Sequence, residues 1–373
     1  FLFISESKAR ELETICLIGA ELEKRGYTVG VLSWWLGNGK DDFEPIEADV
    51  LISHAVYKDK SLNRELSYVR GRTRVLNMQC EQIYAQKDLV NPKSPWKMEG
   101  RTNEIMHVSW GEANYRKLVN EDGIPKELVR IVGNPILDTL RPPLNRIYKS
   151  REEICREYSL KPDKRICLFI SSFSCVDIPD SIKEPELIGI YQVSIDSQKM
   201  MFDWFDRLMS KRDDISFIYR MHPAEKDNKA LRKLEDKYLN FRVISDYTVK
   251  QWIMVSDVIY NWYSSSLAEI YFAGKSCFIL RPVDMPAEYD CTIFDNGHFI
   301  TEYDEFEKTV DMEDCPWPVP IENITDNYYV DENEFTYSKI ATLAEEVLHS
   351  DMKYQEYIPT GEDIKIGRAS CRE

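Results

Sequence analysis

The sequence has 373 residues, of which 43 % are hydrophobic and 30 % charged, and its formal net charge is −16 at pH 7. A chain of this length exceeds what one hydrophobic core usually supports, so we expect two domains. The acidic balance argues against a nucleic-acid-binding groove, which needs a basic face. No stretch approaches the roughly 20 consecutive apolar residues of a membrane-spanning helix, and we therefore expect a cytoplasmic protein.

The first third of the chain predicts alternating strands and helices. Residues 9–25 place apolar side chains on one helical face, and Gly26 supplies the stop that ends the helix. Predicted strands fall at residues 1–4, 28–33, 50–53, 74–78, 107–109 and 129–132. Strands that alternate with helices indicate a parallel sheet with both faces covered.

A proline pair, Pro142 and Pro143, interrupts this rhythm. Because two prolines can continue neither a helix nor a central strand, we expect a hinge between domains here. The alternation then resumes, with strands at residues 165–170, 216–220, 241–244, 258–260 and 276–280. A helix over residues 194–211 is expected to bury Met200, Met201, Trp204, Phe205 and Leu208. The predicted fold is therefore α/β, with two doubly wound Rossmann-like domains.

These signals divide the chain into four parts. We expect an N-terminal domain over residues 1–142, a C-terminal domain over 143–300, and an acidic tail over 301–365 that is irregular until a helix at 337–348. Residues 301–373 carry 6 basic and 19 acidic side chains, a local balance of −13. Residues 366–373 match the translation of a widely used sequencing adapter, so we interpret them as an artefact rather than as the native C-terminus.

The nine cysteines form no CxxC pair and no cluster with histidine, and the sequence has no DxD motif. Scattered cysteines in apolar surroundings are typical of reduced, packed thiols, not of a disulfide framework or a zinc site. The sequence therefore predicts no metal site and no bound cofactor.

Polar groups follow three predicted strands of the second domain at their carboxyl ends, where open parallel sheets bind ligands. They are Ser171 and Ser172, the segment Arg220-Met221-His222-Pro223, and the segment Ser264-Ser265-Ser266. The ring of His222 can donate to a phosphate oxygen or, when protonated, neutralise a departing phosphate, and Arg220 could assist. The alternative is a histidine that is satisfied at a strand terminus.

The three serines open a predicted helix at residues 265–272. A helix N-terminus with free amides and hydroxyls attracts anions, and Glu269, about one turn inside, could accept hydrogen bonds from ribose hydroxyls. A plain serine cap with an exposed glutamate is the alternative. A His-Pro strand end and a serine helix start, one strand–helix unit apart, would converge on one phosphate.

These motifs carry a family resemblance. Residues 256–266, followed by Ala273-Gly274-Lys275, resemble the donor-site signature of CDP-glycerol glycerophosphotransferases, although Asn261-Trp262-Tyr263 stands where those enzymes have Thr-Asp-Tyr. The His222-Pro223 motif is similar to that of the same enzymes and of bacterial sialyl- and polysialyltransferases. Residues 1–295 as a whole resemble surface-carbohydrate biosynthesis proteins of capsule and lipopolysaccharide clusters. Supporting segments are Ser7-Lys8-Ala9-Arg10-Glu11-Leu12, Asn77-Met78-Gln79-Cys80-Glu81-Gln82, Trp110-Gly111-Glu112 and Val132-Gly133-Asn134-Pro135-Ile136-Leu137-Asp138.

The resemblance implies a GT-B fold, with two domains facing an interlobe cleft, the nucleotide donor on the C-terminal domain and the acceptor on the N-terminal domain. It implies a metal-independent transferase of bacterial surface polysaccharide, whose donor is a nucleotide-activated sugar or polyol phosphate. The acceptor would be a saccharide or a lipid-linked molecule, with peripheral contact to the inner membrane or the export machinery. Strand-end position and the resemblance together give the candidate donor-binding residues, which are Ser171, Ser172, Arg220, His222, Pro223, Ser264, Ser265, Ser266 and Glu269.

An inverting transferase also needs a general base that deprotonates the acceptor. Glu6 and Glu81 each follow a predicted strand, so with His222 they are the candidate catalytic residues, and His54 and Glu112 stand behind them. Each carboxylate could equally be a capping or salt-bridging group. Two other functions stay open: an isomerase of the UDP-N-acetylglucosamine 2-epimerase type, and a non-catalytic nucleotide-sugar-binding protein of the same pathway.

Overall fold

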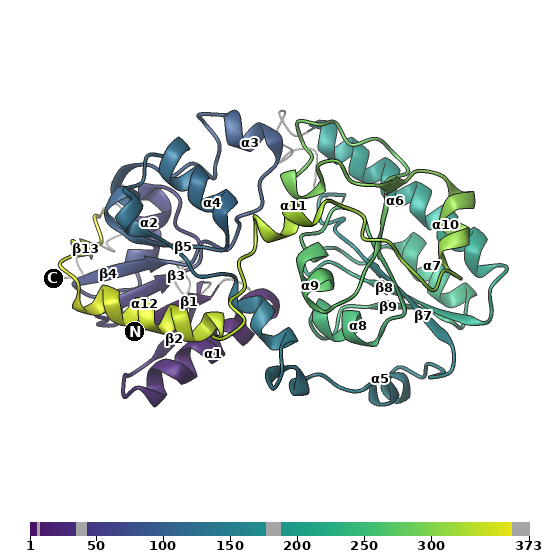
Figure 1. Ribbon diagram of the computed structural model, residues 1–373, viewed down its shortest axis with the longest axis horizontal. Helices are drawn as coiled ribbons and strands as arrows, with labels where there is room; N and C mark the ends of the chain where they lie inside the picture. The colour runs from purple at the N-terminus through teal and green to yellow at the C-terminus, as the bar shows by residue number, and fades with distance from the viewer. Residues whose placement is uncertain (6–7, 35–42, 177–187, 360–373) are drawn as a thin grey trace. The chain divides into compact units, whose positions relative to one another are not determined.

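The computed structural model describes residues 1–5, 8–34, 43–176 and 188–359. The chain forms two compact units, the first made of residues 1–84, 88–138 and 325–373, the second of residues 85–87 and 139–324. Each unit has its own parallel sheet and its own hydrophobic core (Figure 1). This division differs from the expected boundary after residue 142, and the expected tail over 301–365 is shared between the two units.

The first unit is built on a parallel sheet with the strand order β2-β1-β3-β4-β5-β6. Since β3 lies between β1 and β4, the residues that follow these three strands share one carboxyl edge. A short strand after the last helix pairs with β4 in the antiparallel sense. The strands are β1 (Leu2–Ser5), β2 (Gly30–Ser33), β3 (Val50–Ser53), β4 (Arg72–Asn77), β5 (Met106–Ser109), β6 (Val129–Ile131) and β13 (Gln355–Glu356).

Helices cover both faces of this sheet. Successive strand residues point to opposite faces, so each strand contributes to two buried clusters. Phe3 and Ile52 share a buried cluster with residues of α1 and α12, whereas Leu2 and Leu51 share another with residues of α2. The helices of this unit are α1 (Lys8–Lys24), α2 (Asp59–Leu66), α4 (Glu112–Arg116) and α12 (Thr336–His349). The strand faces thus alternate as a doubly wound domain requires.

The last helix, α12, belongs to the first unit and packs on α1, β3 and β4 (Figure 1). Asp138 caps it: Oδ1 accepts from the amide of Thr336 at 3.0 Å and Oδ2 from that of Tyr337 at 2.7 Å. Gly133 has a φ of +98°, and a Cβ there would lie 2.4 Å from the carbonyl oxygen of Tyr329. The segment 132–138 is therefore shaped to receive the returning end of the chain.

The second unit has a parallel sheet with the order β12-β11-β10-β7-β8-β9. Its strands are β7 (Arg165–Ile170), β8 (Ile215–Arg220), β9 (Phe241–Ile244), β10 (Val258–Asn261), β11 (Phe278–Leu280) and β12 (Phe299–Ile300). Its helices are α5 (Arg151–Glu157), α6 (Ile188–Met209), α7 (Lys229–Lys237), α8 (Val249–Val255), α9 (Leu267–Phe272) and α10 (Tyr303–Thr309). Two short helices, α3 (Gln86–Val90) and α11 (Ile321–Thr325), lie where the chain passes from one unit to the other.

Aromatic side chains fill the core of the second unit. Phe205 of α6 packs on Phe169 and Phe217, with ring centroids 5.1 and 4.8 Å apart, distances at which tilted rings attract. Four of the five residues that were expected to be buried on α6 are buried, but Met200 is 38 % exposed, so that prediction was wrong. The buried face follows the spacing i, i+3, i+4, i+7 from Met201, and Met200 lies at its margin.

The expected irregularity of the acidic tail was also wrong. Before α12 the tail contains α10, which buries Phe306 against Trp204 with ring centroids 5.7 Å apart. Acidic residues in and just after α10 pair with basic residues that follow α6: Asp311 contacts Arg212 at 2.7 Å and Glu307 contacts Lys211 at 2.6 Å. Helices as short as α10 and α11 give too weak a periodic signal to stand out in the sequence.

None of the helices within the described ranges combines the length and the apolar character needed to cross a bilayer. The eight cysteines in these ranges are free thiols.

Candidate functional site

Hydroxyl and imidazole groups meet at the carboxyl edge of the second-unit sheet. Ser171 and Ser172 follow β7, His222 follows β8, and residues 264–266 follow β10. β7 lies between β8 and β10, and Ile170 pairs with both Arg220 and Asn261, so the three strands end at the same level. The structure thus brings the three predicted segments to one edge, where open α/β sheets bind ligands.

Local hydrogen bonds fix the ring of His222. Its Nδ1 accepts from the backbone amide of Ala224 at 3.1 Å, and its own amide donates to Oε2 of Glu225 at 3.0 Å. Because Nδ1 accepts, the neutral ring carries its proton on Nε2, the atom that would donate to a phosphate oxygen. His222 is half-buried and Pro223 is exposed.

Glu225 is a residue of this edge to which the sequence motif assigned no role. Its Oε1 accepts from the hydroxyl of Tyr219 at 2.7 Å, and that hydroxyl is also hydrogen-bonded to Oγ of Ser171 at 2.9 Å. Burial raises the pKa of Tyr219 well above its usual value, so the phenol stays neutral. The carboxylate of Glu225 therefore joins the end of β7 to the His222 turn, a link between strands that sequence spacing does not show.

Arg220 is turned to backbone groups. The side chain is 5 % exposed, and its guanidinium donates to the carbonyls of Met221 and of Tyr247, the latter at 2.9 Å. Those bonds hold the segments after β8 and β9. Its role in donor binding stays a prediction, since two of its donors are occupied by carbonyl oxygens.

The serine turn is organised by Asn261, the last residue of β10. Its side chain accepts from the amide of Ser264 and donates to the Ser264 carbonyl, both at 2.9 Å, and the amide of Ser266 donates to Oγ of Ser264 at 3.3 Å. α9 begins at Leu267 rather than at the expected residue 265. Of the three serine amides, those of Ser264 and Ser266 are therefore occupied, while exposed Ser265 has no hydrogen-bond partner within the described ranges for its amide or its hydroxyl.

Ser172 adds an unsatisfied group to the same edge. Its Oγ is buried without a hydrogen-bond partner in the described part of the chain. Buried hydroxyls are normally bonded, so an unsatisfied one marks a place where a ligand or water is expected.

Glu269 is 8 % exposed, which removes the alternative of an exposed glutamate beside a serine cap. Burial raises the pKa of its carboxyl to about 7, and the positive charge of Lys250 opposes that shift. Lys250 is 1 % exposed and donates from Nζ to Oγ1 of Thr139 at 2.7 Å. Carboxyl groups that titrate near neutral pH are typical of functional sites. The sequence signal for a charged partner of Glu269 was Lys250, a lysine inside the apolar helix α8, and sequence reasoning missed it.

The candidates for the general base in the first unit lie in different surroundings. Glu6 lies outside the described residues. Glu81 forms an ion pair with Arg10 at 2.9 Å, and both side chains are about two-fifths exposed, at 42 % and 41 %. Glu112 is exposed in the first turn of α4. His54, which follows β3, is only 7 % exposed.

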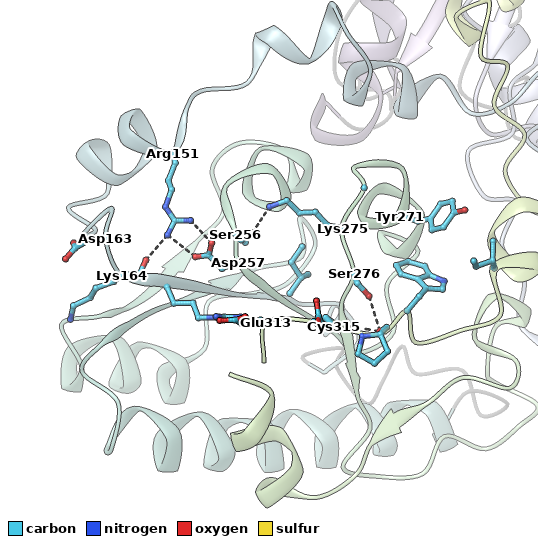
Figure 2. Close-up of a pocket in the computed structure, with 17 residues that line it drawn as sticks. Arg151, Asp163, Lys164, Ser256, Asp257, Tyr271, Lys275, Ser276, Glu313 and Cys315 are labelled. Atoms are coloured by element: carbon cyan, nitrogen blue, oxygen red, sulfur yellow. Dashed lines mark hydrogen bonds and ion pairs between the residues drawn. The ribbon is translucent and has the colours of Figure 1, made fainter. Parts of the chain in front are cut away.

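A cavity of about 1090 Å³ lies at the opposite, amino-terminal edge of the second-unit sheet (Figure 2). Its lining includes Arg151 and Asp257, which point toward one another and form two hydrogen bonds at 3.0 and 2.8 Å. Lys275 donates to the carbonyl of Ser256 at 2.6 Å. Arg151, Asp257 and Lys275 thus have partners within the unit. Open parallel sheets bind ligands beyond the carboxyl ends of their strands, so this cavity at the amino-terminal edge is separate from the predicted site.

Across the described ranges, no group of histidine, cysteine, aspartate and glutamate side chains is placed to hold a metal ion.

The two Rossmann-like units identify the fold as GT-B, as expected from the sequence. No family model and no curated protein matches the sequence. Solved structures do match. The wall teichoic acid polymerase TagF superposes with a TM-score of 0.56 at 13 % identity, covering 93 % of this chain and 89 % of its own.

Two further matches were solved with UDP-GlcNAc or with UDP. The UDP-GlcNAc 2-epimerase from Neisseria meningitidis, bound to UDP-GlcNAc, has a TM-score of 0.53 at 15 % identity and covers 93 % of this chain and 98 % of its own. MnaA from S. aureus, in a co-structure with UDP, has a TM-score of 0.53 at 15 % identity, covering 96 % and 99 %. At such identities the likeness concerns the fold.

Proposed function

We propose that the chain is a transferase that uses a nucleotide-activated donor in bacterial surface polysaccharide biosynthesis, with the donor bound by the second unit. The observation that carries this proposal is the shared edge of β10, β7 and β8, where His222, Ser172 and Ser265 follow strands that end at the same level. The GT-B fold supports it, because the matching proteins include a teichoic acid polymerase and proteins solved with UDP or UDP-GlcNAc.

In the proposed reaction these groups stabilise the departing nucleotide. The Nε2 proton of His222 is donated to an oxygen of the leaving phosphate, and Ser265 supplies its amide and hydroxyl to the same group. Donors fixed in place before reaction are worth more than mobile water, because no reorganisation is needed as charge develops. Glu269 in its ionised form accepts hydrogen bonds from ribose hydroxyls. The reaction is an inverting displacement that needs no metal ion.

The donor site is tested by thermal shift of the full chain with CMP, CDP, UDP and GDP. A nucleotide that binds only the folded protein raises the melting temperature, and at 100 times its Kd it adds about 2.7 kcal/mol of stability. We expect one nucleotide to give a clear shift that is reduced in Ser265→Ala. Ser276→Ala, at the opposite edge of the sheet, is the matched control. A shift that is unchanged in Ser265→Ala, or absent for every nucleotide, would contradict this site.

A product assay separates transfer from the other functions. Incubation with the donor sugar of the preferred nucleotide and a mixed oligosaccharide acceptor should release free nucleotide and an extended acceptor. Conversion of the sugar nucleotide to its 2-epimer without acceptor would instead establish an isomerase, which the matches to 2-epimerases keep as the second candidate. Binding without any turnover would establish a nucleotide-sugar-binding protein.

A further inference from the structure

Arg281 is the first residue after β11, the strand beside β10 in the second-unit sheet. Ile279 of β11 pairs with Asn261, the last residue of β10, so Arg281 lies at the carboxyl edge that also carries the serine turn, residues 264–266. The side chain of Arg281 is 4 % exposed. Arginine is almost never buried to this extent unless its charge is paired, so its contacts call for an explanation.

The guanidinium of Arg281 joins two segments of this edge. Its Nε donates to the backbone carbonyl of Trp262 at 3.0 Å, and its two terminal nitrogens donate to the carboxylate of Asp290 at 3.0 and 3.4 Å. The rings of Phe299 and Phe294 lie beside the charge, with centroids 4.9 and 5.1 Å from the guanidinium carbon. A planar guanidinium fixes the direction of both contacts, which the ammonium of a lysine cannot do.

Tyr263, which directly precedes the serine turn, is held by the same part of the chain. Its hydroxyl donates to the carbonyl of Tyr289, and its ring stacks on that of Phe294 with centroids 5.8 Å apart. Because Arg281 holds the carbonyl of Trp262, both residues that lead into the serine turn are fixed by segments that follow β11.

Local hydrogen bonds set the shape of the serine turn but not its direction. Within the described ranges, the hydrogen bonds of residues 264–266 end on residues 261–270, which belong to the end of β10, the turn itself and α9. The direction in which the turn leaves the sheet depends on the residues before it. Trp262 stacks on Phe173 with ring centroids 4.4 Å apart, and Arg281 holds its carbonyl. Contacts from the segments after β7 and β11 therefore aim the turn.

A buried ion pair is a costly way to make such a contact. Removing two charges from water costs free energy that their attraction often fails to recover, and apolar residues of similar volume are frequently as stable or more so. The aromatic rings beside Arg281 offer an apolar setting for such a residue. The pair of Arg281 and Asp290 is therefore better explained by the geometry that it imposes on Trp262 than by a gain in stability.

We propose that Arg281, paired with Asp290, is a positioning residue of the donor site, a role that rests on the proposed function. The pair sets the direction in which the serine turn presents the amide and hydroxyl of Ser265 to the donor phosphate. Arg281 acts through the carbonyl of Trp262 and contacts neither the donor nor the reacting atoms. A turn that is held in place before the donor arrives loses less conformational freedom on binding, so donor affinity should depend on the pair.

A double-mutant cycle on the full chain tests this role. The probe is whichever of CMP, CDP, UDP and GDP gives the largest thermal shift, and its Kd is measured by isothermal titration. Arg281→Lys keeps a positive charge opposite Asp290 but removes the planar fork, and we expect it to weaken binding about tenfold. Ser265→Ala should weaken binding in the wild type and have little further effect in Arg281→Lys, because a misdirected Ser265 no longer contacts the phosphate. His222→Ala should weaken binding by the same factor in both backgrounds.

The matched control is a second arginine–aspartate pair of the same unit. Asp257→Asn breaks the paired hydrogen bonds with Arg151 at the opposite edge of the sheet and should leave the Kd unchanged (Figure 2). Wild-type affinity in a folded Arg281→Lys, or an equal loss from Ser265→Ala in both backgrounds, would overturn the proposal while leaving the donor site intact. Failure of every nucleotide to bind the wild-type chain would instead contradict the proposed function, and with it the role of the pair in donor binding.

Hydrogen exchange tests the positioning without any nucleotide. In the full wild-type chain, peptides that span residues 262–266 should exchange slowly, and in Arg281→Lys or Asp290→Asn they should exchange faster, while peptides from β7 exchange alike in all three proteins. Equal exchange at residues 262–266 in the wild type and a folded variant would overturn the positioning role. Rapid exchange there in the wild-type chain would overturn it whether or not the variants fold, since the turn would not be held before the donor binds.

Discussion

The carboxylate of Glu225 accepts the backbone amide of His222 at 3.0 Å. The same carboxylate accepts the hydroxyl of Tyr219, so the turn that carries the histidine is tied to the sheet core. His222 is thereby held with Nδ1 occupied by the amide of Ala224. A group fixed in this way can donate from Nε2 without reorganising, which is the property required for stabilising a leaving phosphate.

His222→Ala should weaken nucleotide binding or lower turnover by about 10²-fold or more, since it removes the Nε2 donor. Isothermal titration and steady-state kinetics with the nucleotide selected by thermal shift give the measurement. His298→Ala is the matched control, because the side chain of His298 is 74 % exposed. Donor kinetics that do not change in His222→Ala would remove the central residue of the proposed site.

The stability of the second unit should fall as pH rises from about 4.5 to 7. The pKa of Glu269 is about 7 in the folded chain and 4.5 for the solvated carboxyl of the unfolded chain, so the folded chain binds the proton more tightly. The contribution is present below about 4.5 and lost above about 7, a difference on the order of 3 kcal/mol. Glu269→Gln should therefore be more stable than wild type at pH 8 and similar at pH 4.5.

The same titration should appear in nucleotide binding. If ionised Glu269 accepts the ribose hydroxyls, affinity should increase through about pH 7 in wild type and be pH-independent and weaker in Glu269→Gln. Glu288→Gln, an exposed glutamate of the second unit, should match wild type. Affinity that decreases through this range would show that the protonated carboxyl is the binding form.

Asp138→Ala should destabilise the first unit by about 1–2 kcal/mol, because α12 loses the acceptor of two backbone amides. Urea unfolding followed by circular dichroism measures this change. Asp326→Ala removes only a partly exposed ion pair with Arg116 and should cost less than about 1 kcal/mol. Equal effects of the two substitutions would contradict the capping role of Asp138.

A fragment of residues 139–324 should fold and keep the nucleotide selectivity of the full chain, without transfer. It contains the whole second-unit sheet, and α12 is left out because it packs in the first unit. Binding is measured by the same nucleotide panel. The opposite result, with nucleotide bound by the first unit and none by this fragment, would reverse the assignment of the donor.

Activity should survive a chelator, since the proposed reaction relies on His222 and Ser265 rather than on a cation. Transfer is measured in EDTA and again after addition of magnesium or manganese. A loss in EDTA that either metal restores would show that the charge on the leaving phosphate is stabilised differently.

Local sequence predicted most of the strands and the sheet edge at which they end. Buried strands such as β7 are short apolar runs bounded by polar residues, and this pattern depends only on neighbours in the chain. In a parallel sheet, residues that directly follow a strand lie at the carboxyl edge, where ligands bind. Ser172, His222 and Ser265 were identified as candidates on this basis. The two doubly wound domains follow from the same alternation, whereas the GT-B fold was implied by the family resemblance.

Which polar groups are buried, and what they contact, could be seen only in the folded chain. Lys250 and Glu269 are distant in the chain, and the shift in the pKa of Glu269 arises from burial that no local pattern encodes. Asp138 and Thr336 are 198 residues apart, so the membership of α12 in the first unit depends on a cap that spacing does not predict. Local sequence sets backbone conformation, whereas desolvation and hydrogen-bond satisfaction depend on segments that folding alone brings together.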